Sequence, residues 1–502
     1  MKRVQGFMRA IPALGVAALL AACGGGGGGD SGLSADPVAP TLSATALPNP
    51  VVQQSRLSIT GTASDDQALR DVVVSVNGVT TTATLTLDAF QADISLKAGS
   101  NTYAVTATDT AGNQRSVTGT VYFGHRVAAG GANSAALVNG QLYAWGQNHR
   151  GQAGIGQTTE LGDAAHPVTP RAINTTVPFV ALSSKLNHVA AVDANGEVWT
   201  WGESTDGQLG QGATASCGGA VLCSTEPGKV AGLSNVVSVA TGYDHTLALD
   251  AAGSVWAFGL NTLGQLGNGT SVSSNLPVKV TWNPGDAATV GRIVQVMAGS
   301  ASSYALDDKG QVWAWGRNQY GNLGQSTQDM LVHATPVLVT GLAGVRIRSI
   351  AGGRDHVLAL ADTGVVYGWG LNASSQVGYN QSDWPDDILT PRALPTTQSG
   401  PRVLEVYANG NVSFIKRDNG LVYAWGQYDT GGGSYEGPTA FAELADLRLG
   451  DLAVGVTHRL ALTAAGGLVS WGWSFEGSLG IADAAPAFEY PNLQTVSLSP
   501  VP

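Results

Sequence analysis

The sequence predicts an all-β chain in which a seven-bladed β-propeller follows a small β-sandwich. An aromatic-Gly pair recurs seven times, at intervals of 46 to 57 residues. Short apolar and β-branched runs alternate with Gly- and Asp-bearing turns, and no amphipathic period of helix length appears. About 80 residues before the first repeat also read as strands but lack the repeat. Together these features predict a ring of similar sheets with one unrelated β domain in front of it.

The repeat can be followed along the chain by its aromatic-Gly pair. In the copy around Val239–Thr270, four strands are expected at 236–240, 246–250, 254–259 and 277–280. A period of this length is typical of repeat arrays, and sheets packed around an axis leave only short edges. The predicted propeller spans residues 124–498, with pairs at Trp145-Gly146, Trp201-Gly202, Phe258-Gly259, Trp315-Gly316, Trp369-Gly370, Trp425-Gly426 and Trp471-Gly472.

The fuller motif of the repeat is V-x-x-V-A-x-G-x-x-H-x-x-A-L-x-x-x-G-x-V-W-A-W-G-x-N-x-x-G-Q-L-G. It resembles the repeat of the regulator of chromosome condensation family, from Arg126 to roughly Leu498. The resemblance implies a seven-bladed β-propeller. It implies no single activity, because propellers host unrelated functions. The Trp that follows the repeat Gly in the family's plant photoreceptor is replaced here by Tyr243 and Arg354, so light sensing is not expected.

The N-terminal residues 1–22 read as a secretory signal. Lys2, Arg3 and Arg9 precede an apolar run, Ile11 to Ala22, that is too short to span a bilayer. The run ends in Leu20-Ala21-Ala22-Cys23, which resembles a bacterial lipobox and implies that Cys23 is acylated, for example with palmitate; a plain cleavage site with an incidental Cys is the alternative. Gly24 in place of Asp favours the outer membrane of the cell envelope. Residues 23–40 are rich in Gly, Ser, Pro and Asp and predict a flexible tether.

Residues 41–123 show strands at 57–61, 72–76 and 103–108, closed by Asp109-Thr110-Ala111-Gly112-Asn113. This segment looks like a bacterial immunoglobulin-like domain. Its turn carboxylates, those of Asp65, Asp66, Asp71 and Asp109, have the oxygen chemistry that Ca²⁺ takes. Capping of local backbone N–H groups is the alternative.

The charge balance excludes one class of partner. The chain holds 36 Asp and Glu against 25 Lys and Arg, and removal of residues 1–22 takes three more positive charges away. Nucleic-acid binding needs a basic footprint, which is missing, so no nucleic-acid partner is expected. We expect a monomer without cofactor that touches the membrane only through its lipid. An oxidising envelope predicts a disulfide between Cys217 and Cys223.

Four histidines recur at one repeat position, 13 residues before the aromatic-Gly pair: His188, His245, His356 and His458. Asp244 and Asp355 precede two of them, which suggests a hydrolase. A residue that recurs at one blade position is better explained by the architecture, and Ser302 and Val412 stand at the same position in other blades. None of the common catalytic motifs is present. We therefore predict no catalytic residue and no metal centre.

Strand direction predicts the working face. In an antiparallel blade, the first-to-second and third-to-fourth connections lie at one end, opposite the short second-to-third hairpins. That end carries variable polar and aromatic residues of the kind that form binding hot spots. They are Asn187, Tyr243, Asp244, Arg317, Tyr320, Arg354, Asp355, Asn411, Tyr428, Trp473 and Phe475, with His149 nearby.

The chain is thus predicted to be a non-enzymatic binding module for an envelope or extracellular protein or glycan. The alternative is an envelope enzyme, or an enzyme accessory, acting on polysaccharide or peptidoglycan. The segment 490–498 repeats the last-strand pattern of 276–280, so we also expect the first and last strands of the ring to share one closing sheet.

Overall fold

The computed structural model describes residues 36–45, 51–160, 167–218, 221–379, 387–427, 434–441, 444, 449–482 and 488–498. Within these residues the fold is nearly all β, with one short helix, α1 (Pro284–Ala287), and two 3₁₀ turns, Thr340–Leu342 and Pro395–Thr397. The all-β prediction is confirmed. No helix in the described ranges is both long and apolar enough to cross a membrane. Residues 1–35, with the predicted signal, Cys23 and most of the tether, lie outside the described part.

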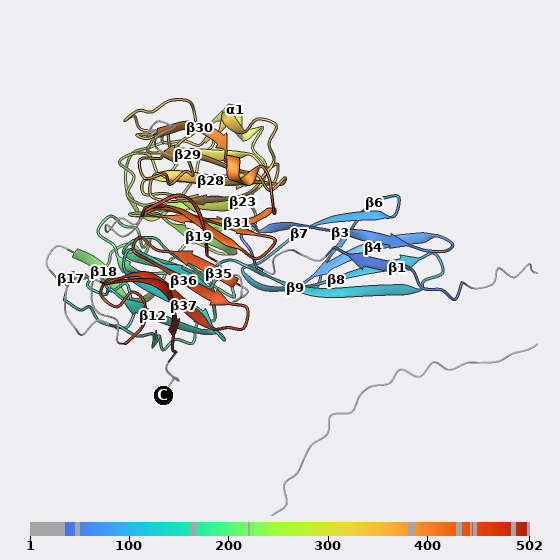
Figure 1. Ribbon diagram of the computed structural model, residues 1–502, viewed down its shortest axis with the longest axis horizontal. Helices are drawn as coiled ribbons and strands as arrows, with labels where there is room; N and C mark the ends of the chain where they lie inside the picture. Colours follow the sequence, from blue (N-terminus) through green and yellow to red (C-terminus); the bar gives the residue numbers. More distant parts are fainter. Residues whose placement is uncertain are drawn as a thin grey trace, which may run out of the picture.

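The first body is a sandwich of two sheets that projects from one face of the ring (Figure 1). Side chains alternate between core and solvent; in β4, for example, Val72, Val74 and Val76 are buried while their neighbours are not. One sheet has the order β1 (Thr41–Ala44), β3 (Arg56–Ser64), β7 (Ala89–Ser95), β6 (Thr84–Thr86); the other has β2 (Val51–Val52), β9 (Gln114–Phe123), β8 (Gly99–Asp109), β4 (Leu69–Val76), β5 (Val79–Thr82).

The second body consists of seven sheets that follow one another along the described chain, which we number as blades 1 to 7. Each consists of consecutive antiparallel strands. The strands are β10 (Val127–Ala129), β11 (Asn133–Val138), β12 (Gln141–Gly146), β13 (Arg171–Ala172); β14 (Phe179–Ser184), β15 (His188–Asp193), β16 (Val198–Glu203), β18 (Val221–Lys229) with β17 (Ser216–Gly218); β19 (Val236–Thr241), β20 (His245–Asp250), β21 (Val255–Gly259), β22 (Ser274–Lys279); β23 (Ile293–Ala298), β24 (Ser302–Asp307), β25 (Val312–Gly316), β26 (Val337–Leu338); β27 (Ile347–Gly352), β28 (His356–Ala361), β29 (Val366–Leu371), β30 (Asp387–Ala393); β31 (Val403–Asn409), β32 (Asn411–Arg417), β33 (Val422–Gln427), β34 (Ser434–Phe441); and β35 (Leu449–Val454), β36 (His458–Thr463), β37 (Leu468–Ser474), β38 (Phe488–Val496).

The aromatic-Gly pair packs each blade against the one before it. The aromatic ring is fully buried in all seven blades. The indole N–H of Trp315, for instance, donates to the carbonyl of Gln265 in the G-Q-L-G turn of blade 3, at 2.9 Å. The following Gly has positive φ, as Gly202 does at +97°, and a Cβ there would lie 2.4 Å from the Asn187 carbonyl oxygen. The aromatic-Gly pair and the G-Q-L-G turn therefore recur together because each contacts the other across a blade boundary.

Ring closure differs from the expectation. β10 pairs only within blade 1 and β38 pairs with β37 of blade 7, so the two ends of the ring do not share a sheet. Closure comes instead from contacts between the two blades. Buried Asp451 of blade 7 accepts hydrogen bonds from the backbone N–H of Arg126 and Val127, and from His125 Nδ1 at 2.9 Å. The shared-sheet prediction was wrong because each blade completes its own four strands from contiguous chain.

The sandwich sits on the hairpin face of the ring, the end that carries the second-to-third turns. Ser55 donates to the carbonyl of Val294 at 2.9 Å through its backbone N–H, and the Tyr122 hydroxyl donates to the carbonyl of Val180 at 2.5 Å. Arg56 forms an ion pair with Asp308, in the blade 4 hairpin, at 2.7 Å. The opposite end, which we call the loop face, is not covered by the sandwich.

Candidate docking face

The loop face is formed by the first-to-second and third-to-fourth connections, as predicted. An equivalent backbone bond fixes it in six of the seven blades: the N–H of the residue after the aromatic-Gly pair donates to a carbonyl in the first-to-second connection. Examples are Glu203 to Asn187 at 3.0 Å and Arg317 to Ala301 at 3.0 Å. Because these positions are equivalent, side chains at the same repeat position can be compared directly between blades. Tyr428 lies outside the described residues.

Blades 4 and 5 form a charge-complementary sector. Buried Asp355 is contacted by Arg317 at 3.4 Å, by Arg354 at 3.2 Å, and by the Ser300 hydroxyl at 2.9 Å. The Arg317 guanidinium lies 5.1 Å from the ring centre of Tyr320. Four of the predicted residues, Arg317, Tyr320, Arg354 and Asp355, are thus brought together. Their contacts are mostly with one another, which indicates a structural network on this side.

Blades 2 and 3 place two carboxylates where blades 4 and 5 place an ion pair. Glu203 follows the aromatic-Gly pair of blade 2 as Arg317 does in blade 4, and Asp244 precedes the repeat His in blade 3 as Asp355 does in blade 5. Glu203 forms an ion pair with Arg150 at 3.0 Å and accepts a hydrogen bond from the Asn187 amide at 3.0 Å. Within the described residues, no basic side chain lies within ion-pair distance of Asp244. We call Glu203, Asp206 and Asp244 the acidic sector.

The acidic sector disfavours ionisation of its own members. Burial raises the pKa of Asp244 to about 6, and the Asp206 and Glu203 carboxylates add to the effect. Burial and Glu203 also raise the pKa of Asp206. Asp244 was predicted from the sequence, whereas Glu203 and Asp206 were missed. Comparison of the residue after each aromatic-Gly pair, Glu203 against Arg317, would have found the first of them.

The remaining predicted residues flank these two sectors. Phe475 is 38% exposed, and Trp473 beside it is partly buried in β37. Tyr243 is partly buried, and its backbone N–H donates to the Ser300 carbonyl. Asn411 accepts a hydrogen bond from Gln376 at 3.4 Å. Burial and Arg150 lower the pKa of His149. The described part of the face therefore offers separate aromatic and charged positions.

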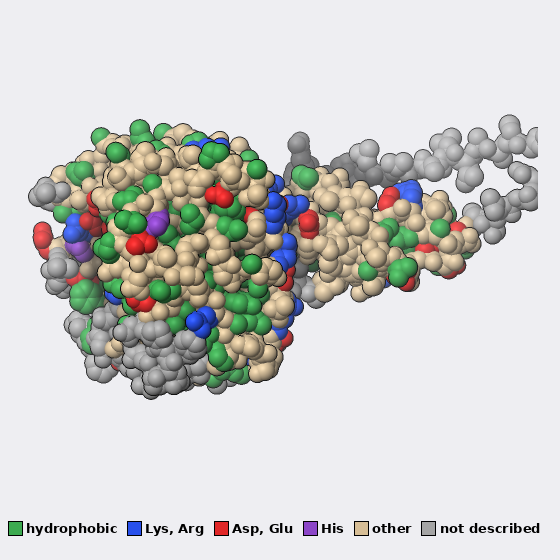
Figure 2. Space-filling view, turned by 90° about the horizontal axis from the view of Figure 1, so that it is seen from above, with side chains coloured by type: hydrophobic (Ala, Val, Ile, Leu, Met, Phe, Trp, Pro, Cys, Tyr) green, Lys and Arg blue, Asp and Glu red, His purple; other side chains and the backbone are tan. Residues whose placement is uncertain are grey.

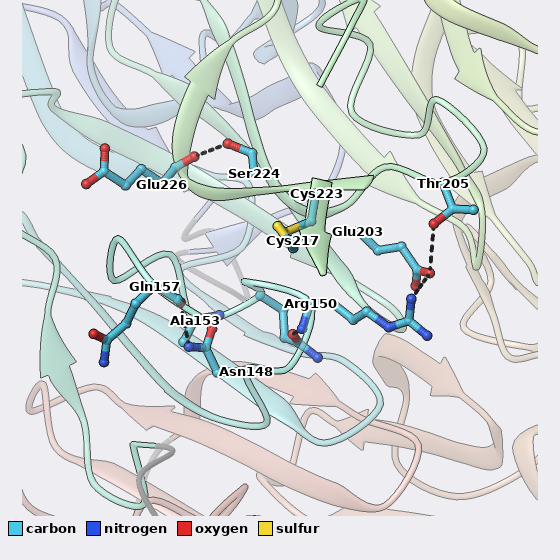
Figure 3. The surroundings of a disulfide bond; sticks show 11 residues. Asn148, Arg150, Ala153, Gln157, Glu203, Thr205, Cys217, Cys223, Ser224 and Glu226 are labelled. Carbon is cyan, nitrogen blue, oxygen red and sulfur yellow. Dashed lines mark hydrogen bonds and ion pairs between the residues drawn. A yellow bond between two sulfur atoms is a disulfide. The ribbon is translucent and has the colours of Figure 1, made fainter. Parts of the chain in front are cut away.

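The disulfide predicted between Cys217 and Cys223 is present, with the two Cα atoms 5.7 Å apart. It closes the β17–β18 hairpin of blade 2, and Cys223 is the cross-strand partner of Glu203 (Figure 3). Strand β18 of this hairpin also contacts the blade 1 loop, because the Gly156 N–H donates to the Thr225 carbonyl at 2.9 Å. The disulfide thus orders the strand beside the acidic sector.

The four repeat histidines form hydrogen bonds between adjacent blades, and we call these contacts histidine pins. Each Nε2 lies 2.6 to 2.9 Å from a Ser or Thr hydroxyl of the next blade. That hydroxyl donates to a carbonyl, as Ser303 does to Gln265, so the imidazole N–H is the donor to it. Burial lowers the pKa of each histidine to about 3, which keeps the ring neutral. The pairs are His188 with Thr246, His245 with Ser303, His356 with Ser413, and His458 with Ser134.

A lysine that sequence reasoning missed closes the central channel at the loop face. Lys185 occupies the position held by Gly in five other blades, namely Gly130, Gly242, Gly299, Gly353 and Gly455. Its ammonium group reaches across a channel of about 160 Å³ and donates to the carbonyl of Gly352 at 2.7 Å and to that of Ala298. Burial lowers the pKa of Lys185 to about 7. Alignment of the glycines would have singled this residue out.

In the sandwich, carboxylate oxygens of Asp36, Asp65 and Asp109 lie within 4.8 Å of one another, whereas Asp66 and Asp71 are not part of the group. Asp65 accepts the backbone N–H groups of Gln67 and Ala68, and Asp109 accepts that of Asn113. These contacts are the local capping that was the alternative to Ca²⁺.

Comparison with known proteins places the ring in a family. The family model described as RCC1-like domain matches residues 78–415. The chain is 28% identical over 378 residues to the human E3 ubiquitin-protein ligase HERC2, covering 72% of this chain and 7% of that protein. It is 30% identical over 313 residues to the Arabidopsis thaliana ultraviolet-B receptor UVR8, covering 60% of this chain and 67% of the receptor.

Among solved structures, Prp20p from Saccharomyces cerevisiae superposes with a TM-score of 0.60 at 22% identity, covering 71% of this chain and 86% of that one. This likeness supports the propeller fold alone. The repeat, the sheet topology and the family match agree, and the chain belongs to the RCC1-like domain family.

Proposed function

We propose that this protein is a non-enzymatic binding module of the bacterial cell envelope, whose loop face binds a partner protein through a basic side chain. The observation that carries the proposal is the acidic sector. At the repeat position where blades 4 and 5 pair Arg317 with Asp355, blades 2 and 3 hold Glu203 and Asp244, and Asp244 has no ion-pair partner among the described residues. A Lys or Arg from a partner would supply the cation that the chain itself supplies in blade 4.

The physical case rests on the raised pKa of Asp244. A partly buried carboxylate with acidic neighbours is destabilising when ionised, and a cation brought by a partner removes that cost. Charge-assisted hydrogen bonds to a carboxylate are among the stronger polar contacts in interfaces. Exposed Phe475 and the Tyr243 side chain offer aromatic contact area elsewhere on the same face. The sandwich packs on the other face, so it leaves the described residues of the loop face uncovered.

The comparisons are consistent with protein binding but do not name a partner. RCC1-like domains typically mediate protein interactions, and the solved structure of Prp20p was described together with its binding to Gsp1p and histones. Neither partner is carried over to this chain. Since the chain spans only 7% of HERC2, the activity of that ligase is not carried over either.

The envelope location rests on the sequence. Leu20-Ala21-Ala22-Cys23 supports acylation of Cys23, and the Gly/Ser-rich residues 24–40 would let the sandwich and ring extend from the membrane. The outer membrane is favoured because Gly24 follows the Cys. In this arrangement the sandwich lies between the anchor and the ring in the chain, and the loop face points away from the sandwich.

Charge neutralisation on the two faces tests the proposal. The pair Asp206→Asn and Asp244→Asn should reduce the amount of envelope protein retained on the immobilised ring by about tenfold or more. The matched pair Asp88→Asn and Asp418→Asn removes the same charge from exposed sites on the sandwich and the hairpin face, and should retain it. If both double variants retained the same amount of envelope protein, the acidic sector would not be the binding site. Release of sugars from envelope polysaccharide by the intact protein would favour the enzyme alternative.

A further inference from the structure

A cleft of about 860 Å³ separates the sandwich from the hairpin face of blades 4 to 6. Its volume is within the range of ligand-binding clefts, which often lie between domains. Lys and Arg side chains gather where the two bodies meet (Figure 2). In a chain with a formal net charge of −11, this gathering of cations needs an explanation.

The carboxylates that line the cleft already have partners. Asp93 and Asp308 pair with Arg56 at 3.8 and 2.7 Å, and Asp362 pairs with Arg346 at 3.1 Å. Glu405 pairs with Lys416 at 3.1 Å, and Asp307 accepts N–H groups of its own hairpin and of the Trp313 indole. Arg56 thus serves two of these carboxylates, and Asp307 has only N–H donors, so the contacts reduce the negative charge of the cleft without cancelling it.

Three cations of the cleft wall lack a carboxylate partner within the described residues: Lys309, Arg348 and Arg402. Lys309 donates to the Thr289 carbonyl, and Arg402 donates to the Asp362 carbonyl. Arg348 donates to the carbonyls of Val403 and Leu404, while its buried Nε has no partner. Burial and nearby Arg402 lower the pKa of Arg348 to about 10, although the Asp362 and Glu405 carboxylates oppose this shift. The lining thus holds five basic and five acidic side chains, and three of the five cations form no ion pair with a carboxylate of the described residues.

The facing wall, formed by the sandwich, has a different chemistry. It presents side-chain amides and hydroxyls from Gln53, Gln54, Ser58, Thr60 and Gln91. Such groups hydrogen-bond to sugar hydroxyls, and guanidinium groups bind carboxylates in a bidentate manner. Leu57 and Leu404, both partly buried, add apolar surface on which the CH face of a sugar ring can lie.

We propose that this cleft binds an acidic oligosaccharide, with the sugar carboxylates on Arg348 and Arg402 and the hydroxyls on the sandwich wall. The site is separate from the loop face and does not depend on the protein partner proposed above. It gives the sandwich a role beyond spacing, because the sandwich supplies one wall of the site.

The repeat provides a matched control for the test. Arg402 and Arg292 each stand directly before the first strand of a blade, and each guanidinium donates to a carbonyl in the hairpin turn of the preceding blade. Only Arg402 lines the cleft. Arg402→Gln and Arg292→Gln should therefore lower the melting temperature by similar amounts, and only Arg402→Gln should affect binding.

Isothermal titration calorimetry of the intact protein with tetragalacturonate should show saturable binding that weakens about tenfold in Arg402→Gln, weakens with added NaCl, and is unchanged in Arg292→Gln. Neutral cellotetraose should bind more weakly. The proposal is overturned if tetragalacturonate gives no saturable heat, if both variants lose binding equally, or if inorganic phosphate or an acidic peptide binds as tightly as the uronate.

Discussion

At the residue scale, the histidine pins explain a pattern that the sequence shows but does not interpret. The repeat position holds His only where the next blade offers a hydroxyl beside its own repeat position. Where the next blade has Val189, Val357 or Arg459, the position holds Asn133, Ser302 or Val412 instead. The histidine and the hydroxyl therefore form one unit spread over two repeats.

These pins predict a steep loss of stability in acid. The folded pKa of each histidine lies near 3, below the 6.5 of the unfolded chain. The unfolded state therefore binds more protons between pH 6.5 and 3, and the free energy of unfolding falls as the pH drops through that window. Calorimetric melting temperatures of His245→Gln should fall less steeply across this range than those of the wild type. The reason is that the unfolded variant binds about one proton fewer than the unfolded wild type. Parallel pH profiles would contradict the neutral, buried imidazole.

Replacement by Asn at Asp244 and at Asp355, which are equivalent positions, should change the free energy of unfolding in opposite directions. Asp244 has a raised pKa, so its contribution to stability is lost as pH rises through about 4 to 6. Asp244→Asn should therefore raise the free energy of unfolding at pH 7.5 by about 1–2 kcal/mol and have little effect at pH 4. Asp355→Asn, which loses Arg317 and Arg354 as charged partners, should lower it at pH 7.5. Destabilisation by both variants would contradict the comparison between the two sectors.

At the element scale, ring closure depends on a side chain rather than on a shared sheet. Asp451 is 2% exposed and accepts hydrogen bonds from the first strand of blade 1. Burial alone would lower the pKa of neighbouring His125, but the Asp451 carboxylate outweighs it and raises that pKa. The sandwich, His125, blade 1 and blade 7 all meet at this point.

Replacement of this closing carboxylate should destabilise the ring. Asp451→Ala leaves the buried N–H groups of Arg126 and Val127 without acceptor and should cost about 2–4 kcal/mol. Asp418→Ala, in an exposed hairpin of blade 6, should cost less than about 0.5 kcal/mol. Calorimetry should give a lower melting temperature for Asp451→Ala than for Asp418→Ala. Equal melting temperatures would contradict closure through Asp451.

At the scale of the whole molecule, the repeat and its strand-like runs predicted the all-β fold, and strand direction predicted the end of the ring that carries the variable residues. The position of the sandwich on the hairpin face depends on contacts such as Arg56 with Asp308, 252 residues apart, which no local pattern shows. The shared closing sheet failed for a related reason: the terminal strand pattern does not say which edge a strand pairs with.

The candidate face was predicted in part. Tyr243, Asp244 and Phe475 could be found because they interrupt the repeat. Glu203 and Lys185 were missed because their significance depends on comparison with Arg317 and with the repeat glycines. The boundary between blades 4 and 5 holds the ion pair of Arg317 and Asp355, whereas the boundary between blades 2 and 3 holds the two carboxylates Glu203 and Asp244. This difference becomes visible only in the assembled ring.

The proposed anchor makes a prediction about the whole protein. If Cys23 is acylated, Cys23→Ser should move the protein from the membrane fraction to the soluble fraction of the envelope, because the lipid supplies the membrane affinity. Fractionation with immunoblotting measures this, and the mass of the N-terminal peptide gives an independent check. A wild-type protein already found in the soluble fraction would contradict the anchor.

The most direct test of the central claim maps the bound partner onto the two faces of the ring. A photo-crosslinking residue is placed at Tyr243 or Phe475 on the loop face, or at Ala252 or Asn419 in exposed hairpins, in the intact protein exposed to its own envelope extract. We expect the same partner to be crosslinked from Tyr243 and Phe475 and not from the hairpin positions, with the adduct lost when Asp206→Asn and Asp244→Asn are added. Adducts that form only from Ala252 or Asn419, or that persist without the two carboxylates, would contradict the assignment of the loop face as the docking surface.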